Sequence, residues 1–203
     1  AVASQSRGRL VCRGKAGHAG TTPMALRRDA LAGAAEFISL TENFARGRSP
    51  LVATVGMITV ADGAANVIPG EVTLTLDVRH PANAAQRRAV AALVNGAGRI
   101  ARRRGLACVW HETMQHPATP CSPRLASLLQ ESVRTVQGRS VKLVSGAGHD
   151  AVVMAALTPV AMLFVRCRDG LSHHPAESAS PADLAMALGV IVDFLERLAD
   201  ATR

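Results

Sequence analysis

The sequence predicts an α/β protein built from two parts, and three observations carry this prediction. Segments with the apolar spacing of strands alternate with segments spaced as helices along the chain of 203 residues. The chain is 48% hydrophobic and 19% charged, so it holds enough apolar side chain for a buried core. Pro117, Pro120 and Pro123 lie close together and mark the junction between the two parts.

The first part, residues 9–116, is predicted to hold four strands and two helices. The strands are expected at 9–17, 51–61, 71–79 and 106–114, and the helices at 26–46 and 84–104. In the third strand apolar residues alternate with polar ones, which indicates one buried and one polar face. Gly105 is expected to end the second helix. Two helices can cover one face of a four-stranded, largely antiparallel sheet, whose other face stays open to water or to a partner.

The second part, residues 117–203, is predicted to alternate helix and strand. Helices are expected at 122–137, at 150–157 and from 181 onward, and strands at 141–145 and 159–165. Ser180 should cap the last helix, with Pro181 at its first position and Asp183 closing a capping box. The expected buried stripe of this helix is Leu184, Leu188, Ile191, Leu195 and Leu198. This order favours an α/β layer with parallel strands, but two strands are too few for a complete one.

Composition excludes several classes of function. The net charge of +8 would suit nucleic acid, but the arginines are scattered and aromatic residues make up only 2%, so no stacking surface for bases is expected. No run of about 18 apolar residues predicts a membrane span, and residues 1–9 lack the apolar stretch of a secretory signal. The four cysteines are too far apart in sequence for a zinc knuckle, and we interpret them as reduced thiols of a cytoplasmic protein.

Two segments of the first part combine exposed loop chemistry with residues able to bind a ligand. In 17–24, His18 stands between small residues at a strand end, where it could reach a ligand or simply form part of a turn. The segment 66–70 contains Asn66, and Arg79 ends the strand that follows, on its polar face. A guanidinium there can hold a carboxylate through two hydrogen bonds, although a surface salt bridge with Asp77 explains Arg79 equally well.

Two segments of the second part stand out for similar reasons. The segment 145–150 places Gly148 between strand and helix, where backbone N–H groups can approach a ligand, and His149 lies beside Asp150. The segment 172–177 follows an apolar strand and contains His173, with a carboxylate four residues later. Imidazole suits zinc, manganese, cobalt or nickel, but no HExxH or CxxC motif accompanies this histidine.

In this order, four strings resemble the N-carbamoyl-L-amino-acid hydrolase, allantoate amidohydrolase and β-ureidopropionase group of the aminoacylase-like dimetal peptidases. They are GHAGTTPM at 17–24 with RRDA at 27–30, NVIPG at 66–70 with DVR at 77–79, SGAGHDA at 145–151, and SHHPAE at 172–177. The resemblance implies a ferredoxin-like lid, or dimerisation, domain at 9–116. It also implies that 117–203 form the C-terminal portion of the metal-dependent catalytic domain.

The resemblance also implies roles for single residues. His173 matches the last metal ligand, and His18 matches the histidine that reaches from the lid of one subunit into the partner's site to polarise the scissile carbonyl. Asn66 and Arg79 match substrate binders, Arg79 for the carboxylate, and the Gly148 backbone matches a further contact. His149 matches the motif as a further substrate-binding candidate.

The family's remaining metal ligands and its general base are expected upstream of residue 1, so this chain is expected to be incomplete and inactive alone. The whole enzyme would be a homodimer that uses two divalent metal ions, Zn, Mn, Co or Ni, to cleave a linear ureido or amide C–N bond in a small substrate with a carboxylate. The alternative interpretation is a non-catalytic dimerisation and ligand-binding module.

Overall fold

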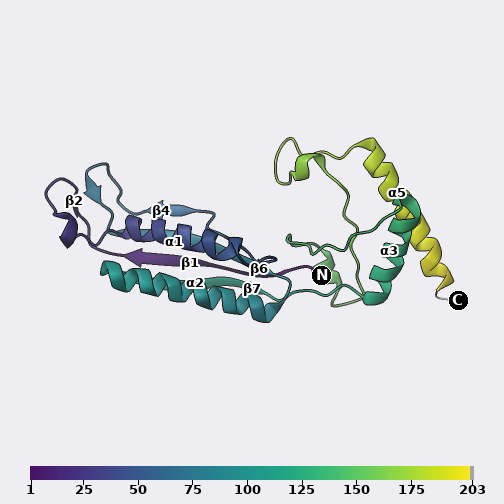
Figure 1. Ribbon diagram of the computed structural model, residues 1–203, viewed down its shortest axis with the longest axis horizontal. Coiled ribbons are helices and arrows are strands. Elements are labelled where there is room, and N and C mark those ends of the chain that lie inside the picture. Colours follow the sequence, from purple (N-terminus) through teal and green to yellow (C-terminus); the bar gives the residue numbers. More distant parts are fainter. Residues whose placement is uncertain (202–203) are drawn as a thin grey trace. The chain divides into compact units, whose positions relative to one another are not determined.

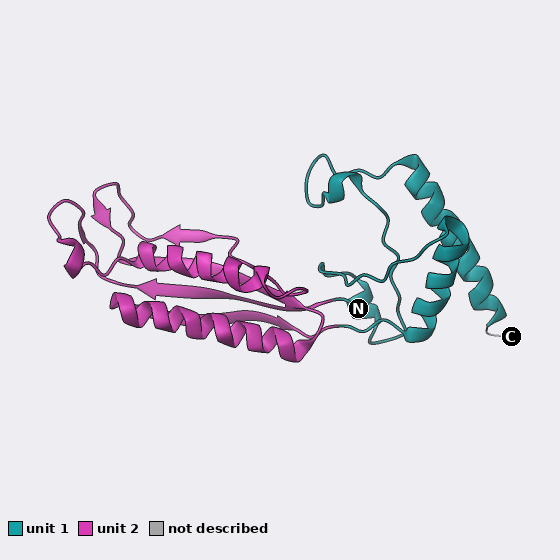
Figure 2. Ribbon diagram, viewed as in Figure 1, with its two compact units in different colours: residues 1–2, 119–203 teal, residues 3–118 magenta. Residues whose placement is uncertain are grey.

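The computed structural model describes residues 1–201, and these residues form two compact units. One unit is Ala3–Ala118, which is drawn in magenta as unit 2 in Figure 2 and is called the first unit here because it comes first along the chain. The other, called the second unit here, combines Ala1–Val2 with the described residues from Thr119 onward and is drawn in teal as unit 1. The predicted mixture of helices with an antiparallel sheet is confirmed. The assignment of 9–116 to a lid and of 117–203 to part of a catalytic domain stays a prediction.

Three long strands form the centre of the first unit: β1 (Ser4–Arg13), β6 (Glu71–His80) and β7 (Ala107–His116). Strand β1 lies between the other two and is antiparallel to both. The expected strand at 51–61 forms as two short strands, β3 (Val52–Thr54) and β4 (Ile58–Val60), which both pair with β6. The sheet therefore has five strands, where the sequence predicted four.

A one-residue shift in register explains why the strand at 51–61 divides. Thr54 lies opposite Asp77, but Ile58 lies opposite Leu74, so four steps along one strand match three along the other. The extra residue has the effect of a bulge, which interrupts the pairing. Thr75 spans the gap, because its hydroxyl accepts a hydrogen bond from the Met57 N–H at 3.0 Å.

Helices α1 (Ala30–Arg46) and α2 (Asn83–Arg104) pack on the face of the sheet that carries the apolar side chains (Figure 1). Helix α1 contacts β1, β3 and β6, and α2 contacts β1, β6 and β7. The core between the layers includes Leu10, Val72, Leu74, Leu76, Val78, Phe37 and Leu93. The predicted alternation in β6 is confirmed, since its apolar residues face the helices while Thr73, Thr75, Asp77 and Arg79 share the opposite side of the strand.

Local chemistry sets the ends of both helices. Helix α1 starts later than predicted because the Asp29 carboxylate accepts hydrogen bonds from the N–H groups of Leu31 and Ala32. The residues just before it form a short 3-10 turn, η1 (Met24–Leu26). Gly105 ends α2 as predicted, with a φ of +65°, a conformation that glycine adopts without strain.

A separate two-stranded sheet lies at one end of the first unit. It consists of β2 (Gly17–His18) and β5 (Val67–Ile68), which are antiparallel (Figure 1). This small sheet joins the loop that follows β1 to the loop that precedes β6.

The second unit contains the helices α3 (Pro123–Gln137), α4 (Ala151–Met154) and α5 (Pro181–Asp200), and a 3-10 turn, η2 (Arg168–Gly170). The strands expected at 141–145 and 159–165 do not form, apart from one isolated bridge at Ser145. A strand requires a neighbour that accepts its backbone hydrogen bonds. Within residues 1–201 these extended segments have no sheet to join, so that prediction was wrong.

Helix α5 begins as predicted, because the Ser180 hydroxyl accepts a hydrogen bond from the Asp183 N–H. Of its predicted buried stripe, Leu198 is partly buried, but the other four residues are exposed. Leu184, Leu188, Ile191 and Leu195 are 54%, 62%, 44% and 55% exposed. The helix packs on α3 through its other side, where Val190 is buried. Between residues 1 and 201 no helix is both long and apolar enough to cross a membrane.

The packing of Trp110 over Gly8 predicts a large effect of a small substitution. A Cβ atom at Gly8 would overlap the Trp110 ring and lie 2.5 Å from the His111 carbonyl oxygen. We expect Gly8→Ala to lower the free energy of unfolding by about 1–3 kcal/mol. Urea unfolding monitored by the fluorescence of the single tryptophan measures it. Gly47→Ala is the control, since a Cβ there meets nothing within 4 Å, and equal effects of both variants would contradict the packing.

Candidate functional site

His18 ends β2 of the small sheet, and Asn66 lies next to it, immediately before β5. His18 pairs with Val67 in the antiparallel register, and the Ala19 N–H donates to the Asn66 carbonyl oxygen at 2.8 Å. Both residues are exposed. The structure therefore brings together two predicted site residues that are 48 positions apart in the sequence.

A hydrogen bond orients the His18 ring. Its Nδ1 accepts from the Gly20 N–H at 3.0 Å. When Nδ1 of a neutral imidazole accepts, Nε2 carries the proton. His18 therefore presents an N–H donor away from its own loop, which is the form needed to polarise a carbonyl oxygen.

Arg27 braces the loop that carries His18. Its guanidinium donates to the carbonyl oxygens of Ala19 at 2.5 Å and Thr22 at 3.1 Å. The Thr22 N–H in turn donates to the His18 carbonyl oxygen. Sequence reasoning included Arg27 in a motif string without a role, and the role depends on a contact that only the folded loop creates.

Arg79 forms a paired contact with Asp77. Its Nε donates to Asp77 Oδ1 at 2.8 Å and its Nη2 to Oδ2 at 3.0 Å. Both residues are two positions apart on β6 and therefore share a face of the strand. The salt bridge that the sequence offered as the alternative explanation of Arg79 is present, and it also holds the guanidinium in a defined orientation.

Strand β1 completes this cluster. Its register places Arg7 opposite Asp77 and Gln5 opposite Arg79. The Asp77 carboxylate accepts from Arg7 Nε at 2.5 Å and from Gln5 Nε2 at 2.7 Å. Neither residue was a sequence candidate, because nothing local indicates that β1 lies beside β6 in this register.

Opposing effects determine the pKa of Asp77. Burial raises it, but hydrogen bonds from Arg79, Arg7 and Gln5 outweigh burial, so the pKa of Asp77 lies below its ordinary value. The hydrogen bond between Arg79 and Asp77 raises the pKa of Arg79. Both groups are therefore charged at neutral pH, and the ion pair persists.

His18 and Asn66 lie at one end of the first unit, and Arg79 and Asp77 lie toward the other end. Strand β6 begins at Glu71, next to the small sheet, and Arg79 is eight residue steps further along it. At about 3.4 Å per residue this separates Arg79 from the small sheet by roughly 27 Å. One copy of this unit therefore does not bring His18 and Arg79 to one small substrate.

The segment around Gly148 and His149 is an exposed loop of the second unit. His149 Nδ1 accepts from the Ala151 N–H at 3.0 Å, which again leaves Nε2 as the donor. A Cβ at Gly148 would meet nothing within 4 Å, so the backbone there is open to approach. Helix α4, which follows, has only four residues.

His173 is exposed and has a φ of +58°, in the left-handed region that non-glycine residues seldom adopt. Its backbone N–H donates to Glu177 Oε2 at 3.0 Å. The neighbouring His174 accepts through Nδ1 from the Ala176 N–H. The imidazole of His173 is thus displayed on a turn and is not packed in the core.

The described residues alone do not fit a two-metal centre. Within residues 1–201 no three His, Cys, Asp or Glu side chains come together as metal ligands could. The Glu177 carboxylate, which is close in sequence, is engaged by the His173 backbone.

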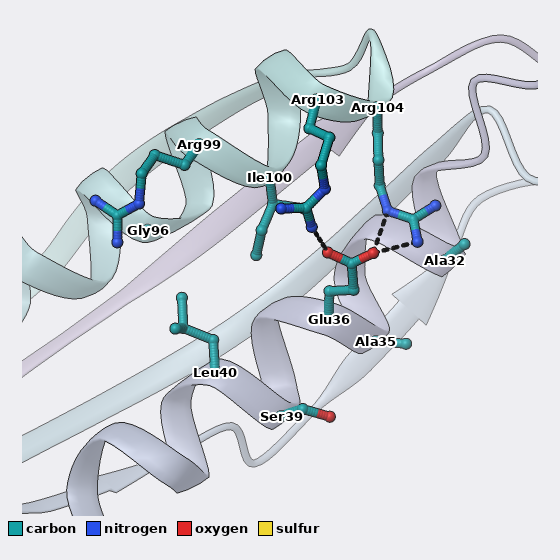
Figure 3. A pocket seen from close by; sticks show the side chains of 10 residues that line it. All are labelled: Ala32, Ala35, Glu36, Ser39, Leu40, Gly96, Arg99, Ile100, Arg103 and Arg104. Atoms are coloured by element: carbon teal, nitrogen blue, oxygen red, sulfur yellow. Dashed lines mark hydrogen bonds and ion pairs between the residues drawn. The ribbon is translucent and has the colours of Figure 1, made fainter.

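A groove of about 610 Å³ lies between helices α1 and α2. Ala32, Ala35 and Gly96 line it, and the Glu36 carboxylate accepts hydrogen bonds from Arg103 and Arg104 across it (Figure 3). Hydrogen bonding to Arg104 is the main reason that the pKa of Glu36 is lowered. None of the predicted site residues lines this groove, so we interpret the ion pairs as a link between the helices.

The chain belongs to Peptidase family M20/M25/M40, whose profile matches residues 2–197. It is 36% identical over 222 residues to an allantoate deiminase of Arabidopsis thaliana, covering 96% of this chain and 42% of that protein. It is 37% identical over 184 residues to an N-carbamoyl-L-amino-acid amidohydrolase of Pseudomonas sp. (strain NS671), covering 90% and 44%. These matches confirm the resemblance that the four strings indicated.

Solved structures agree with this assignment. A hydantoinase/carbamoylase family amidase from Burkholderia multivorans superimposes with a TM-score of 0.90 at 36% identity, covering 97% of this chain and 48% of that one. The chain thus spans about half the length of the relatives that it matches. The roles of the individual site residues stay predictions.

The Asp77 cluster predicts a pH-dependent contribution to stability. The folded-state pKa of Asp77 lies below the value of about 3.9 that an Asp has in the unfolded chain. The stability that the ionised carboxylate contributes is therefore present at neutral pH. It is lost as the pH falls below the unfolded value and through the folded-state pKa. We expect Asp77→Asn to destabilise the chain by about 1–3 kcal/mol at pH 7. The difference from the wild type should shrink toward pH 3, as urea unfolding at both pH values would measure.

The matched control is Glu42→Gln, which removes an exposed carboxylate paired with Arg46 one helical turn away. Exposed pairs of this kind contribute less than about 1 kcal/mol. An Asp77→Asn effect no larger than that of Glu42→Gln, or one independent of pH, would contradict the importance of the cluster.

Proposed function

We propose that this chain is part of a metal-dependent amidohydrolase that cleaves a linear ureido or amide C–N bond. N-carbamoyl amino acids and allantoate are the substrate class. The observation that carries the proposal is an oriented histidine on a strand whose neighbouring segment brings Asn66 close to it, in a protein whose relatives are named for these two reactions.

His18 has the chemistry of a carbonyl-polarising group. Its Nε2 proton can donate to the substrate carbonyl oxygen, and this bond strengthens as the oxygen gains negative charge during attack by water. Asn66, beside it, can donate or accept through its amide and so orient the ureido group. The bracing of this loop by Arg27 reduces the motion that would weaken both contacts.

Arg79 suits the substrate carboxylate. A guanidinium held by Asp77 on one edge keeps a fixed orientation, and the planar group can also meet a carboxylate.

Because about 27 Å separates Arg79 from the small sheet, we propose that one site combines His18 of one copy with Arg79 of another. Met24 and Leu26, which are 76% and 70% exposed in the loop after His18, favour docking of this loop on another polypeptide surface.

Exposed apolar surface on the second unit supports the proposal that this chain is part of a larger enzyme. A cleft of about 950 Å³ lies among α3, α5 and the extended segments 139–144 and 161–167. Many of its lining residues are apolar, and Leu143 and Phe164 are 60% and 48% exposed. Together with the exposed stripe of α5, they leave an apolar surface that a soluble domain normally covers. We propose that the other half of the enzyme covers it and pairs with the unpaired extended segments.

The two metal ions, Zn, Mn, Co or Ni, belong to that whole enzyme. They would supply activated water and polarise the carbonyl. His173 is the one residue that we propose as a ligand from this chain. In the full-length homodimer the first unit would serve as the lid and dimerisation domain.

The proposal is tested by comparing this chain with the full-length polypeptide that contains it. The full-length protein should hydrolyse an N-carbamoyl amino acid or allantoate and hold two divalent ions per chain by elemental analysis. The 203-residue chain should show neither. Turnover with tightly bound, stoichiometric metal in this chain alone would contradict the proposal, as would an inert full-length protein, which would favour the binding-module alternative.

The role of His18 makes a sharper prediction. In the full-length enzyme His18→Ala should lower kcat by about 10²–10³-fold while the metal content stays unchanged, because an oxyanion donor is lost without a ligand. Steady-state hydrolysis and elemental analysis measure both quantities. His111→Ala, which removes another exposed histidine of the same unit, should change neither. Loss of metal from His18→Ala would show that His18 has a different role.

A further inference from the structure

Two of the four cysteines face each other across neighbouring strands. Cys12 on β1 lies directly opposite Cys108 on β7, although 96 positions separate them in the sequence. Their Sγ atoms are 2.7 Å apart. Neither residue is in a disulfide bond. The other two cysteines, Cys121 and Cys167, belong to the second unit.

The strand register suits a covalent bridge. Residues directly opposite each other in an antiparallel pair have Cα atoms about 4.5–5.5 Å apart. Disulfides span Cα separations of about 4.4–6.8 Å. Closing the bond between these two residues therefore requires little movement of the backbone.

We propose that Cys12 and Cys108 are a redox-active pair that closes a reversible cross-strand disulfide when the chain meets a peroxide. The inference concerns the first unit alone and does not depend on the proposed hydrolytic function. All four cysteines were expected to be reduced thiols; the contact between Cys12 and Cys108 arises only from the strand register of the sheet.

The environment distinguishes the two thiols. Cys12 is 1% exposed, whereas Cys108 is only partly buried on β7, which is the last strand in the order of the sheet. The hydrogen bond between the two sulfur atoms lowers the pKa of Cys108, and the same bond, together with burial, raises the pKa of Cys12. Because Cys108 is the more accessible of the two, peroxide reaches its thiolate first, and Cys12 is the thiol that resolves it.

The chemistry balances with hydrogen peroxide as the oxidant. The Cys108 thiolate attacks one peroxide oxygen, an S–O bond forms, the O–O bond breaks, and the leaving hydroxide takes a proton to become water. Cys12 then attacks the Cys108 sulfur, the S–S bond forms, and the second oxygen leaves as water with the Cys12 proton. The two thiols lose two electrons, and the peroxide gains them.

The bridge would link the last strand to the centre of the sheet. The chain between the two cysteines contains the predicted catalytic residue His18 and the predicted substrate binders Asn66 and Arg79. A cross-link that closes so long a loop restricts the unfolded chain strongly. Oxidation should therefore raise the melting temperature of the first unit by several degrees, with Trp110 on β7 as the fluorescent reporter.

The test treats the reduced 203-residue chain with a small excess of hydrogen peroxide and maps its peptides by mass spectrometry without reduction. We expect a peptide pair joined through Cys12 and Cys108, two hydrogens lighter than the separate peptides, which dithiothreitol separates again. The melting temperature should rise with the joined fraction and fall back on reduction.

Two variants separate the roles of the thiols. Cys12→Ser should stop the reaction at a sulfenic acid on Cys108 that dimedone labels, and Cys108→Ser should leave Cys12 unmodified. The double variant Cys121→Ser, Cys167→Ser is the matched control and should form the bridge as the wild type does. Both thiols unmodified while Cys121 or Cys167 is oxidised, or Cys108 over-oxidised without a bridge in the wild type, would overturn the proposal.

Discussion

The antiparallel register of β1 on β6 decides where the functional side chains of the first unit lie. Ten residue pairs define it, from Ser4 opposite His80 to Arg13 opposite Glu71. Side chains alternate between the faces of a strand, so a slip by one residue would exchange the two faces. In the observed register Val72 and Leu74 enter the core, while Asp77 and Arg79 face away from the helices and meet Arg7 and Gln5.

The same register connects stability with the candidate site. The core fixes β6 against both helices, and this fixed strand carries a buried apolar face and a charged face on the same backbone. The Asp77 carboxylate accepts donors from two strands, so it holds the Arg79 guanidinium and also links β1 to β6. On the other side of β1, pairing with β7 brings Cys12 to Cys108.

The second unit behaves differently because two of its segments find no sheet to join within residues 1–201. Segments 141–145 and 159–165 are extended and apolar, yet no sheet forms from them. Helix α5 buries one side on α3 and leaves its leucine stripe exposed. An incomplete layer accounts for these features together, and relatives about twice as long agree with that interpretation.

The sequence by itself determined the features that depend on neighbours within a few residues. These include the alternation in β6, the end of α2 at Gly105, the cap of α5 at Ser180, and the strings that identify the family. Only the tertiary structure decided the division of the strand at 51–61, the closeness of His18 to Asn66, and the contacts of Asp77 and Cys12. The reason is that helix caps and strand alternation are local, whereas register and burial depend on which distant segment becomes the neighbour.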